Sequence, residues 1–237
     1  MKLKSFGCSF IFGTDLKDCD TKPPWSQGSK STWPQGSKST WPALLAQKLD
    51  APYECHARPG SGNLQITERI LNQLPASKDD VFVIGWSWID RFDHYQEINP
   101  WQPWKTLLPG DSNKLSQTYY KYLQTEYSDK LNTLIKIKMV IDILTQHHVR
   151  FLMTYTDVLM FDQQFHTSPA VTHLQSSILP YMTTFEGQTF LDWSRQHGYA
   201  ESSTWHPLEE AHRAAADYMI TFFDKQKIAG PAQQARV

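Results

Sequence analysis

Two groups in the sequence have the types needed for nucleophilic catalysis. Ser9 stands in the stretch Gly7-Cys8-Ser9-Phe10-Ile11-Phe12-Gly13, directly after a short apolar run that predicts a strand. A serine hydroxyl is a weak nucleophile unless a neighbouring base accepts its proton. His206, which is followed by Pro207 just before the last predicted helix, is a candidate for that base. Each also has a structural alternative: a serine that caps a helix or turn, and an ordinary surface or capping histidine.

Two further loops hold candidate hydrogen-bond donors. Gly60-Ser61-Gly62-Asn63 combines an amide side chain with glycines, which let backbone N–H groups approach a ligand closely. Gly85-Trp86-Ser87 adds a hydroxyl. Donors that converge beside a nucleophile form an oxyanion hole. The alternative for each loop is a plain turn.

The elements that must position these groups are strands and helices that alternate along the chain. Apolar runs predict strands, and 3.6-residue spacing predicts the helices between them. The strands are expected at 3–8, 53–57, 81–84 and 151–155, and the helices from 41, over 63–74, over about 114–147 and after Pro207. This alternation predicts a three-layer α/β/α sandwich with a parallel sheet. Because chemistry in such sheets lies at the carboxyl ends of the strands, the loops at 7–13, 58–63 and 85–91 are the expected site.

The remaining segments are expected to be loops of one domain that spans 1–237. Residues 14–42 and 92–113 predict irregular insertions, and about 227–237 a C-terminal tail. The octapeptide QGSKSTWP occurs twice, at 27–34 and 35–42, which is too short a period for a solenoid. We interpret it as a local duplication in a surface loop, and its second copy leads into the helix that begins at Trp41.

Composition and charge exclude several classes of protein. The 23 Lys and Arg against 24 Asp and Glu give a net charge of −1, which does not favour a nucleic-acid or membrane partner. No phosphate-binding loop, dinucleotide fingerprint or metal-ligand spacing occurs, so no cofactor and no metal is expected. The three cysteines lack CxxC spacing, which argues against a disulfide framework. Without a signal-peptide core or a long apolar run, the expected location is the cytoplasm. The oligomeric state is left open.

The four segments, in their order, resemble the SGNH hydrolase superfamily, also called the GDSL-like lipases and acylhydrolases. Residues 7–13 look like its G-D-S-x-x-x-G block, with Cys8 in the Asp position. Residues 58–63 are similar to the second block, and 83–87 to the G-x-N-D block. The stretch that begins at His206-Pro207 is similar to the last block, in which H-P precedes a helix rich in small residues. The resemblance covers residues 3–226.

The resemblance implies a flavodoxin-like fold and serine-based ester hydrolysis. Ser9 would be the nucleophile and His206 the general base, and the Ser9 N–H, the Gly62 N–H and a polar side chain of the third block would hold the oxyanion. Besides Cys8, two positions depart from the family pattern. Ser87 replaces the Asn of the third block, and Asn63 is a candidate substitute for it. Cys8 as the nucleophile is a weaker alternative, because a residue before the nucleophile should point away from the site.

The second departure concerns the group that orients the base. The family's last block is D-x-x-H, but Ser203 occupies the Asp position. Glu201 and Asp192 are the nearest upstream acids, and Ser203 itself or a backbone carbonyl is the remaining candidate in a Ser-His dyad.

The candidate substrate-binding residues are aromatic or basic side chains in or beside the site loops, namely Trp86, Trp88, Trp101, Trp104, Arg58 and Arg91. Sugar rings and acyl groups pack on aromatic faces, so we expect a short-chain ester, such as an acetyl ester, of a carbohydrate or small metabolite. The alternative is that these tryptophans pack beneath loops. Two other functions stay open: a catalytically degenerate binding module for glycans or other small ligands, and a flavodoxin-like binder of flavin or nucleotide.

Overall fold

The apolar run of residues 81–86 forms the strand β3 (Val81–Trp86), in which every side chain is buried. In the computed structural model, which describes residues 1–19, 36–97 and 103–224, β3 lies inside a four-stranded parallel sheet of order β2-β1-β3-β6. A strand covered on both faces requires this continuous apolar pattern. The register places Phe6 beside Ile84 and Gly85 beside Thr154. Trp101, the first copy of the octapeptide and the segment 227–237 lie outside the described residues.

The elements follow one another along the chain largely as the periodicity predicts. The strands are β1 (Leu3–Phe6), β2 (Tyr53–Cys55), β3, β4 (Phe92–Tyr95), β5 (Trp104–Leu107) and β6 (Arg150–Tyr155). The helices are α1 (Ser9–Phe12), α2 (Trp41–Lys48), α3 (Asn63–Leu71), α4 (Lys114–Tyr122), α5 (Glu126–Gln146), α6 (Pro169–Ile178), α7 (Phe190–Gln196) and α8 (Glu209–Asp224), with single turns η2 (Val158–Met160) and η3 (Leu179–Tyr181).

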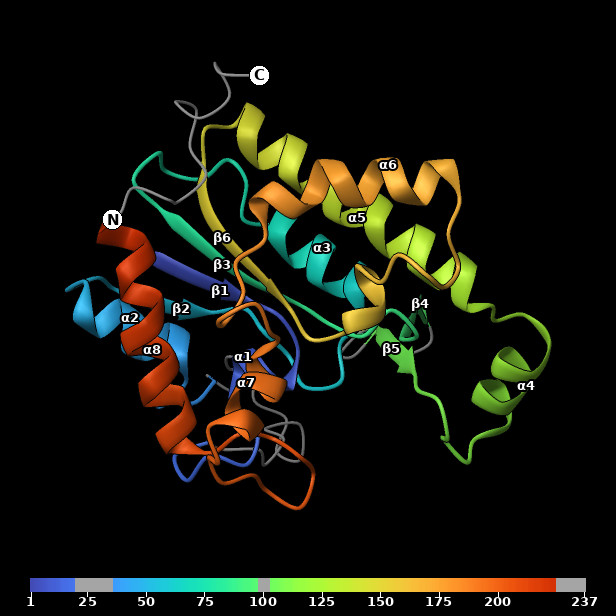
Figure 1. The fold of residues 1–237 in the computed structure, drawn as a ribbon, viewed down its shortest axis with the longest axis horizontal. Helices are drawn as coiled ribbons and strands as arrows, with labels where there is room; N and C mark the ends of the chain where they lie inside the picture. Colours follow the sequence, from blue (N-terminus) through green and yellow to red (C-terminus); the bar gives the residue numbers. More distant parts are fainter. Residues whose placement is uncertain (20–35, 98–102, 225–237) are drawn as a thin grey trace.

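Helices cover both faces of the sheet, which confirms the three-layer prediction (Figure 1). Successive side chains of a strand point to opposite faces. Phe82 and Ile84 therefore pack with α3, α5 and α6 in one apolar cluster. Val83, between them, packs with residues of α2, α7 and α8 in the other. Parallel strands joined by helices bring all their carboxyl ends to one edge of this sheet.

The insertion at 92–113 is more regular than its Trp, Pro and Gly content predicts. It holds an antiparallel pair, β4 and β5, in which Phe92 lies opposite Leu107. The ring of Phe92 stacks on Tyr119 of α4 with centroids 4.2 Å apart. Tyr120 donates its hydroxyl to the carbonyls of Asp90, at 2.6 Å, and Leu107, at 2.8 Å. These contacts join the pair to α4, an arrangement that the sequence pattern did not indicate.

The helix predicted over about 114–147 is two helices. Asn113 accepts a hydrogen bond from the Ser116 N–H at the start of α4, and Thr125 accepts one from the Ser128 N–H at the start of α5. Ser, Thr and Asn favour such N-caps. The apolar stripe that predicted the helix begins at Leu131, so it describes α5 alone.

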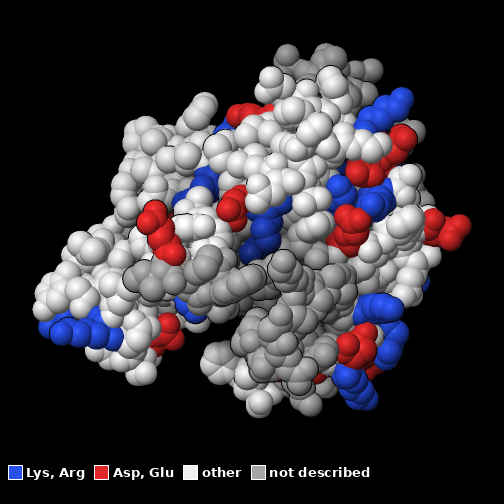
Figure 2. Space-filling model, turned by 180° about the vertical axis from the view of Figure 1, so that it is seen from behind, with Lys and Arg blue, Asp and Glu red and all other residues white. Residues whose placement is uncertain are grey.

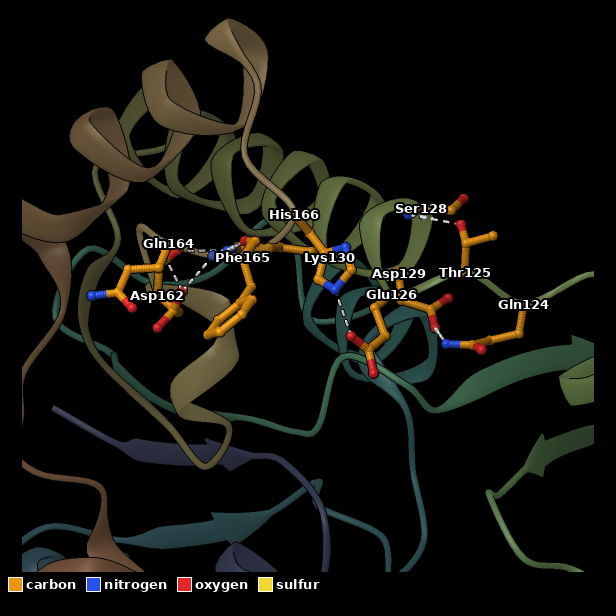
Figure 3. A network of polar contacts seen from close by, with 10 residues as sticks. All are labelled: Gln124, Thr125, Glu126, Ser128, Asp129, Lys130, Asp162, Gln164, Phe165 and His166. Atoms are coloured by element: carbon orange, nitrogen blue, oxygen red, sulfur yellow. Dashed lines mark hydrogen bonds and ion pairs between the residues drawn. The ribbon is translucent and has the colours of Figure 1, made fainter.

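The first turns of α5 hold the segment that follows β6 (Figure 3). Lys130 is almost fully buried and donates its ammonium to the carbonyls of Asp162, at 2.6 Å, and Phe165, at 2.9 Å. Burial lowers the pKa of Lys130. His166 contacts Glu126 at 2.5 Å on the surface beside it. A buried ammonium needs such acceptors, so this network fixes the path of the chain after β6.

Acidic and basic side chains are interspersed on the face that Figure 2 draws, as the net charge of −1 leads one to expect. Among the described helices, none is both long and apolar enough to cross a bilayer.

Candidate active site

Hydrogen bonds join the three predicted site loops at the carboxyl edge of the sheet. The Arg58 N–H donates to the Gly7 carbonyl at 3.0 Å, which links the loops after β2 and β1. The Ser87 N–H donates to the Asn63 Oδ1 at 2.8 Å, which links the loop after β3 to the start of α3. The sheet therefore brings together three segments that are far apart in the sequence.

Ser9 is the first residue of α1, the single short helix that follows β1, and its side chain is only 6% exposed. Two glycines allow this helix to lie against the strand ends. A Cβ atom at Gly7 or at Gly85 would lie 2.6 Å from the Ile11 Cγ1, closer than packed carbon atoms approach. Gly13 ends the helix with a left-handed φ of 84°, which glycine adopts readily.

A carboxylate from the loop after α1 holds the imidazole of His206. Asp15 Oδ2 lies 2.8 Å from His206 Nδ1. The same oxygen accepts hydrogen bonds from Ser202 Oγ, at 2.7 Å, and from Thr204 Oγ1. These bonds, led by that of Thr204, keep the pKa of Asp15 below its ordinary value. A negative carboxylate facing Nδ1 favours the tautomer with a proton on Nδ1, which leaves Nε2 free to act as a base.

Phe10 places His206 beside α1. Its ring lies edge-on to the imidazole, with centroids 5.1 Å apart, and also contacts the ring of Trp88 at 5.4 Å. The residue next to Ser9 thus touches His206 directly. In the described part of the chain, no hydrogen bond joins the Ser9 hydroxyl to His206. Such a bond is often long in an enzyme without substrate and tightens in the complex.

Two of the expected oxyanion donors have partners within the protein. The Gly62 N–H donates to Asp93 Oδ1 at 3.0 Å, and the Asn63 amide donates to the carbonyls of Ser87, at 3.2 Å, and Trp88, at 3.3 Å. Asn63 therefore fixes the loop after β3 instead of projecting from it. The Ser87 hydroxyl, by contrast, is buried and has no hydrogen-bond partner among the described residues. Of the polar side chains expected to bind an oxyanion, only Ser87 retains its full hydrogen-bonding capacity.

Solved structures share this architecture. A lipolytic protein of the G-D-S-L family from Veillonella parvula has a TM-score of 0.52 at 11% identity, over 95% of this chain and 99% of that chain. The psychrotrophic esterase EstA from Pseudoalteromonas, inhibited by monoethylphosphonate, has a TM-score of 0.52 at 10% identity, over 95% and 97%. A carbohydrate esterase family 2 enzyme with a carbohydrate-binding domain from Corynascus thermopiles has a TM-score of 0.54 at 12% identity, over 95% and 66%.

The chain has an SGNH hydrolase-like fold. No protein-family model matches its sequence, and no curated protein matches it either. At 10 to 12% identity the likeness is one of fold. The structure thus confirms the fold that the resemblance of the four short sequence blocks implied.

The orienting group is not where the D-x-x-H block of SGNH hydrolases led us to expect it. Glu201 forms two hydrogen bonds of 2.9 Å with Arg195. Asp192 accepts from the Thr189 hydroxyl at 2.7 Å, at the start of α7. Ser203 is exposed and forms no hydrogen bond with His206. These three expectations are wrong because Asp15, which no spacing rule connects to His206, reaches the imidazole through the fold.

The expected substrate-binding residues lie in different environments in the SGNH-like fold. Trp86 is fully buried in β3 and belongs to the core, so that prediction is wrong. Trp104 lies in β5, where its ring contacts Tyr95 at 5.4 Å. Trp88 lies at the site edge, with the Arg91 guanidinium 4.5 Å above its ring. Arg58 donates to its neighbouring carbonyl, that of Ala57, at 3.0 Å.

Cys8 and the metal-ligating residue types add no further chemistry to this site. Cys8 is buried in the apolar cluster beneath α2 and α8, in keeping with the expectation that it points away from the site. Within the ranges that the structure describes, no group of three His, Cys, Asp or Glu side chains gathers as a metal site.

Proposed function

We propose that this protein is a serine ester hydrolase in which Ser9 is the nucleophile, His206 the general base and Asp15 the residue that positions the base. The observation that carries the proposal is the contact of 2.8 Å between Asp15 and His206 at the edge where α1 presents Ser9. A nucleophile, a base and a group that orients the base together make up the acyl-transfer triad. The three neighbours above, whose names are those of lipolytic proteins and esterases, add support at the level of the fold.

The proposed reaction has two steps. In the first, His206 Nε2 accepts the Ser9 proton, and Ser9 Oγ attacks the ester carbonyl to form a tetrahedral intermediate. The imidazolium is stabilised by Asp15 and then donates the proton to the departing alcohol, which leaves an acyl-serine. In the second step, His206 accepts a proton from water, the resulting hydroxide attacks the acyl group, and Ser9 regains its proton as the carboxylic acid leaves.

The negative oxygen of the intermediate requires donors. We assign this role to the Ser9 N–H, which lies in the first turn of α1, and to the Ser87 hydroxyl, which has no partner among the described residues. The Gly62 N–H contributes only after it exchanges Asp93 for the substrate oxygen. A missing donor lowers such rates by about 10²- to 10³-fold, so a modest turnover number is expected.

The proposed substrate is a short-chain ester, such as an acetyl ester, of a carbohydrate or small metabolite. Trp88 supports this class because its partly exposed ring contacts Phe10, whose own ring contacts His206. Sugar rings pack well on such faces. One of the neighbours is a carbohydrate esterase by name, which agrees with this proposal.

A fluorophosphonate probe tests the chemistry directly, since it phosphonylates an activated serine. We expect labelling of the purified protein at Ser9, mapped by mass spectrometry, and release of 4-nitrophenol from 4-nitrophenyl acetate. Both should be lost in Ser9→Ala and kept in Ser176→Ala, which removes an exposed serine hydroxyl on α6. Turnover that survives in Ser9→Ala would exclude Ser9 as the nucleophile.

A second candidate function is a binding module for glycans on the same fold. The hydrogen bond from Gly62 to Asp93 favours it, because it removes one oxyanion donor of the family pattern. This function predicts ligand binding that Ser9→Ala leaves intact and no covalent adduct with the fluorophosphonate probe.

A further inference from the structure

Two arginines hydrogen-bond to the same residue of the loop that precedes α3. Arg69, from α3, donates its Nη2 to the Ser61 hydroxyl at 2.6 Å. Arg91, from the loop after β3, donates its Nη1 to the Ser61 carbonyl at 3.1 Å. Sequence spacing does not connect these residues, since one lies on a helix and the other in a loop. The fold places both guanidinium groups against Ser61, which directly precedes Gly62.

Neither guanidinium has an acidic partner among the described residues. Within the described part of the chain, the Arg69 side chain forms one hydrogen bond besides that to Ser61, to the Gln65 side chain at 3.4 Å, and its Nε is buried without a hydrogen-bond partner there. A guanidinium carries five N–H donors, so most donors of this pair have no hydrogen-bond acceptor among the residues that the structure describes. Burial, and then the positive charge of Arg58, lower the pKa of Arg69 to about 10. The surroundings of Arg69 therefore disfavour the positive charge of its guanidinium.

The nearest carboxylate does not neutralise the pair by a direct contact. Asp93 attracts Arg69 at longer range, but its two oxygens already accept from four donors of the described chain. These donors are the N–H groups of Gly62 and Gln65, the Gln65 Nε2 and the Thr106 hydroxyl. Asp93 thus serves as the carboxylate at the start of α3, and the Arg69 guanidinium is connected to it through the Gln65 side chain.

A continuous series of ring contacts connects this pair to the proposed base. The Arg91 guanidinium lies 4.5 Å from the ring of Trp88. Trp88 contacts Phe10 at 5.4 Å, and Phe10 contacts His206 at 5.1 Å. The rings of Trp88 and Phe10 therefore lie between Arg91 and the imidazole. An anion bound there would belong to the same substrate as the ester.

We propose that Arg69 and Arg91 form an anion subsite, and that the substrate is an acyl ester of a sugar that carries a carboxylate. This inference rests on the proposed esterase function and adds its substrate class. The planar guanidinium matches a carboxylate with two parallel hydrogen bonds. Buried like charges without a counter-ion lower the stability of the fold. The presence of the two arginines at this place is therefore better explained by ligand binding than by stability.

Matched substrates test the subsite. One is an O-acetylated methyl uronoside, and the other is its uronamide, which is neutral and of the same shape. Acetate release gives kcat/KM for each compound. Each value is divided by the rate of hydroxide-catalysed hydrolysis of the same compound, which corrects for the intrinsic reactivity of its ester. We expect a preference of about tenfold or more for the acid at low ionic strength, expressed in KM and weakened by added salt.

Variants assign the preference to the arginines. Arg91→Gln and Arg69→Gln should each bring the acid-to-amide ratio close to one, and thermal unfolding checks that each variant is folded. Arg150→Gln is the matched control, because Arg150 begins β6 at the opposite edge of the sheet, and it should keep the ratio of the wild type. A ratio near one in the wild type, or a ratio kept by both Arg91→Gln and Arg69→Gln, overturns the subsite.

Calorimetric binding of both compounds to Ser9→Ala separates this inference from the esterase proposal. Hydrolysis of the uronamide without preference for the acid leaves the esterase standing and rejects the subsite. No hydrolysis of either compound or of 4-nitrophenyl acetate, with tighter binding of the acid that Arg91→Gln abolishes, rejects the esterase and retains the subsite in a binding module. If neither compound is hydrolysed and the acid does not bind more tightly than the amide, both proposals are rejected.

Discussion

Asp15 contacts the imidazole of His206 at 2.8 Å although 191 positions separate them along the chain. The carboxylate comes from the loop after the proposed nucleophile instead of the segment before the histidine. Ser202 and Thr204, four and two residues before His206, donate to the same oxygen. The last block thus contributes hydroxyl groups that fix a carboxylate supplied from the other end of the chain.

Asp15→Asn tests this relationship. The amide cannot stabilise an imidazolium and favours the wrong tautomer of His206, so kcat/KM for 4-nitrophenyl acetate should fall by about 10²- to 10⁴-fold. Glu201→Gln, which removes only the exposed pair with Arg195, should change kcat/KM by less than about threefold. The opposite result, a large loss in Glu201→Gln and a small one in Asp15→Asn, would assign the orienting role to Glu201, one of the candidates that the sequence left open.

Ser87→Ala separates catalysis from stability. The Ser87 hydroxyl is buried without a described partner, so its removal should leave the melting temperature unchanged or raise it slightly. If the hydroxyl binds the oxyanion, kcat should fall by about 10²-fold.

The matched control for Ser87→Ala is Ser194→Ala in α7. The Ser194 hydroxyl is buried and donates to the Phe190 carbonyl at 2.6 Å. Its loss should lower the free energy of unfolding by about 1 kcal/mol and leave kcat alone. Equal kcat in wild type and Ser87→Ala would exclude Ser87 from the oxyanion hole.

His212 should make the protein acid-sensitive. It is buried in α8, where its Nδ1 accepts the Trp41 N–H at 3.0 Å, and burial lowers its pKa from 6.5 to about 3. Below pH 6.5 the unfolded chain binds a proton at this residue that the folded chain does not. The free energy of unfolding should therefore fall as the pH drops from 6.5 towards 3, by up to about 1.4 kcal/mol per pH unit.

Denaturant titrations across this pH range measure the effect. His212→Gln should flatten the dependence relative to the wild type, because glutamine does not titrate. His173→Gln on α6, where the side chain is exposed, is the control and should keep the slope of the wild type. Parallel curves for wild type and His212→Gln would contradict the assignment.

Gly85 and Ile11 should be energetically coupled. A Cβ at Gly85 would lie 2.6 Å from the Ile11 Cγ1, so Gly85→Ala should lower the free energy of unfolding by about 1–3 kcal/mol through overpacking. Ile11→Ala removes that atom and leaves a cavity that the new methyl group partly fills. In a double-mutant cycle measured by urea unfolding, the double variant should be more stable than the sum of the single effects predicts, by more than about 0.5 kcal/mol. Additive effects would mean that the strand end adjusts without Ile11.

The sequence alone determined the layers of this protein. Continuous apolar runs such as residues 81–84 predict strands covered on both faces, and the alternation with amphipathic helices permits few other topologies. Ser9, Gly7 and Gly85 were identifiable because strand ends and glycines are local signals. The break between α4 and α5 and the pairing of β4 with β5 were missed, since each depends on packing against residues distant in the sequence.

Tertiary structure decided the partners of the site residues. Asp15 contacts His206, Asp93 accepts a hydrogen bond from the Gly62 N–H, and Trp86 is buried in the core. The spacing of these residues in the sequence indicates none of the three. Hydrogen bonds and burial act over a few ångströms in space, whereas a sequence pattern records only neighbours along a helix or strand. Residue type therefore revealed which groups are able to react, and only the folded chain revealed which of them meet.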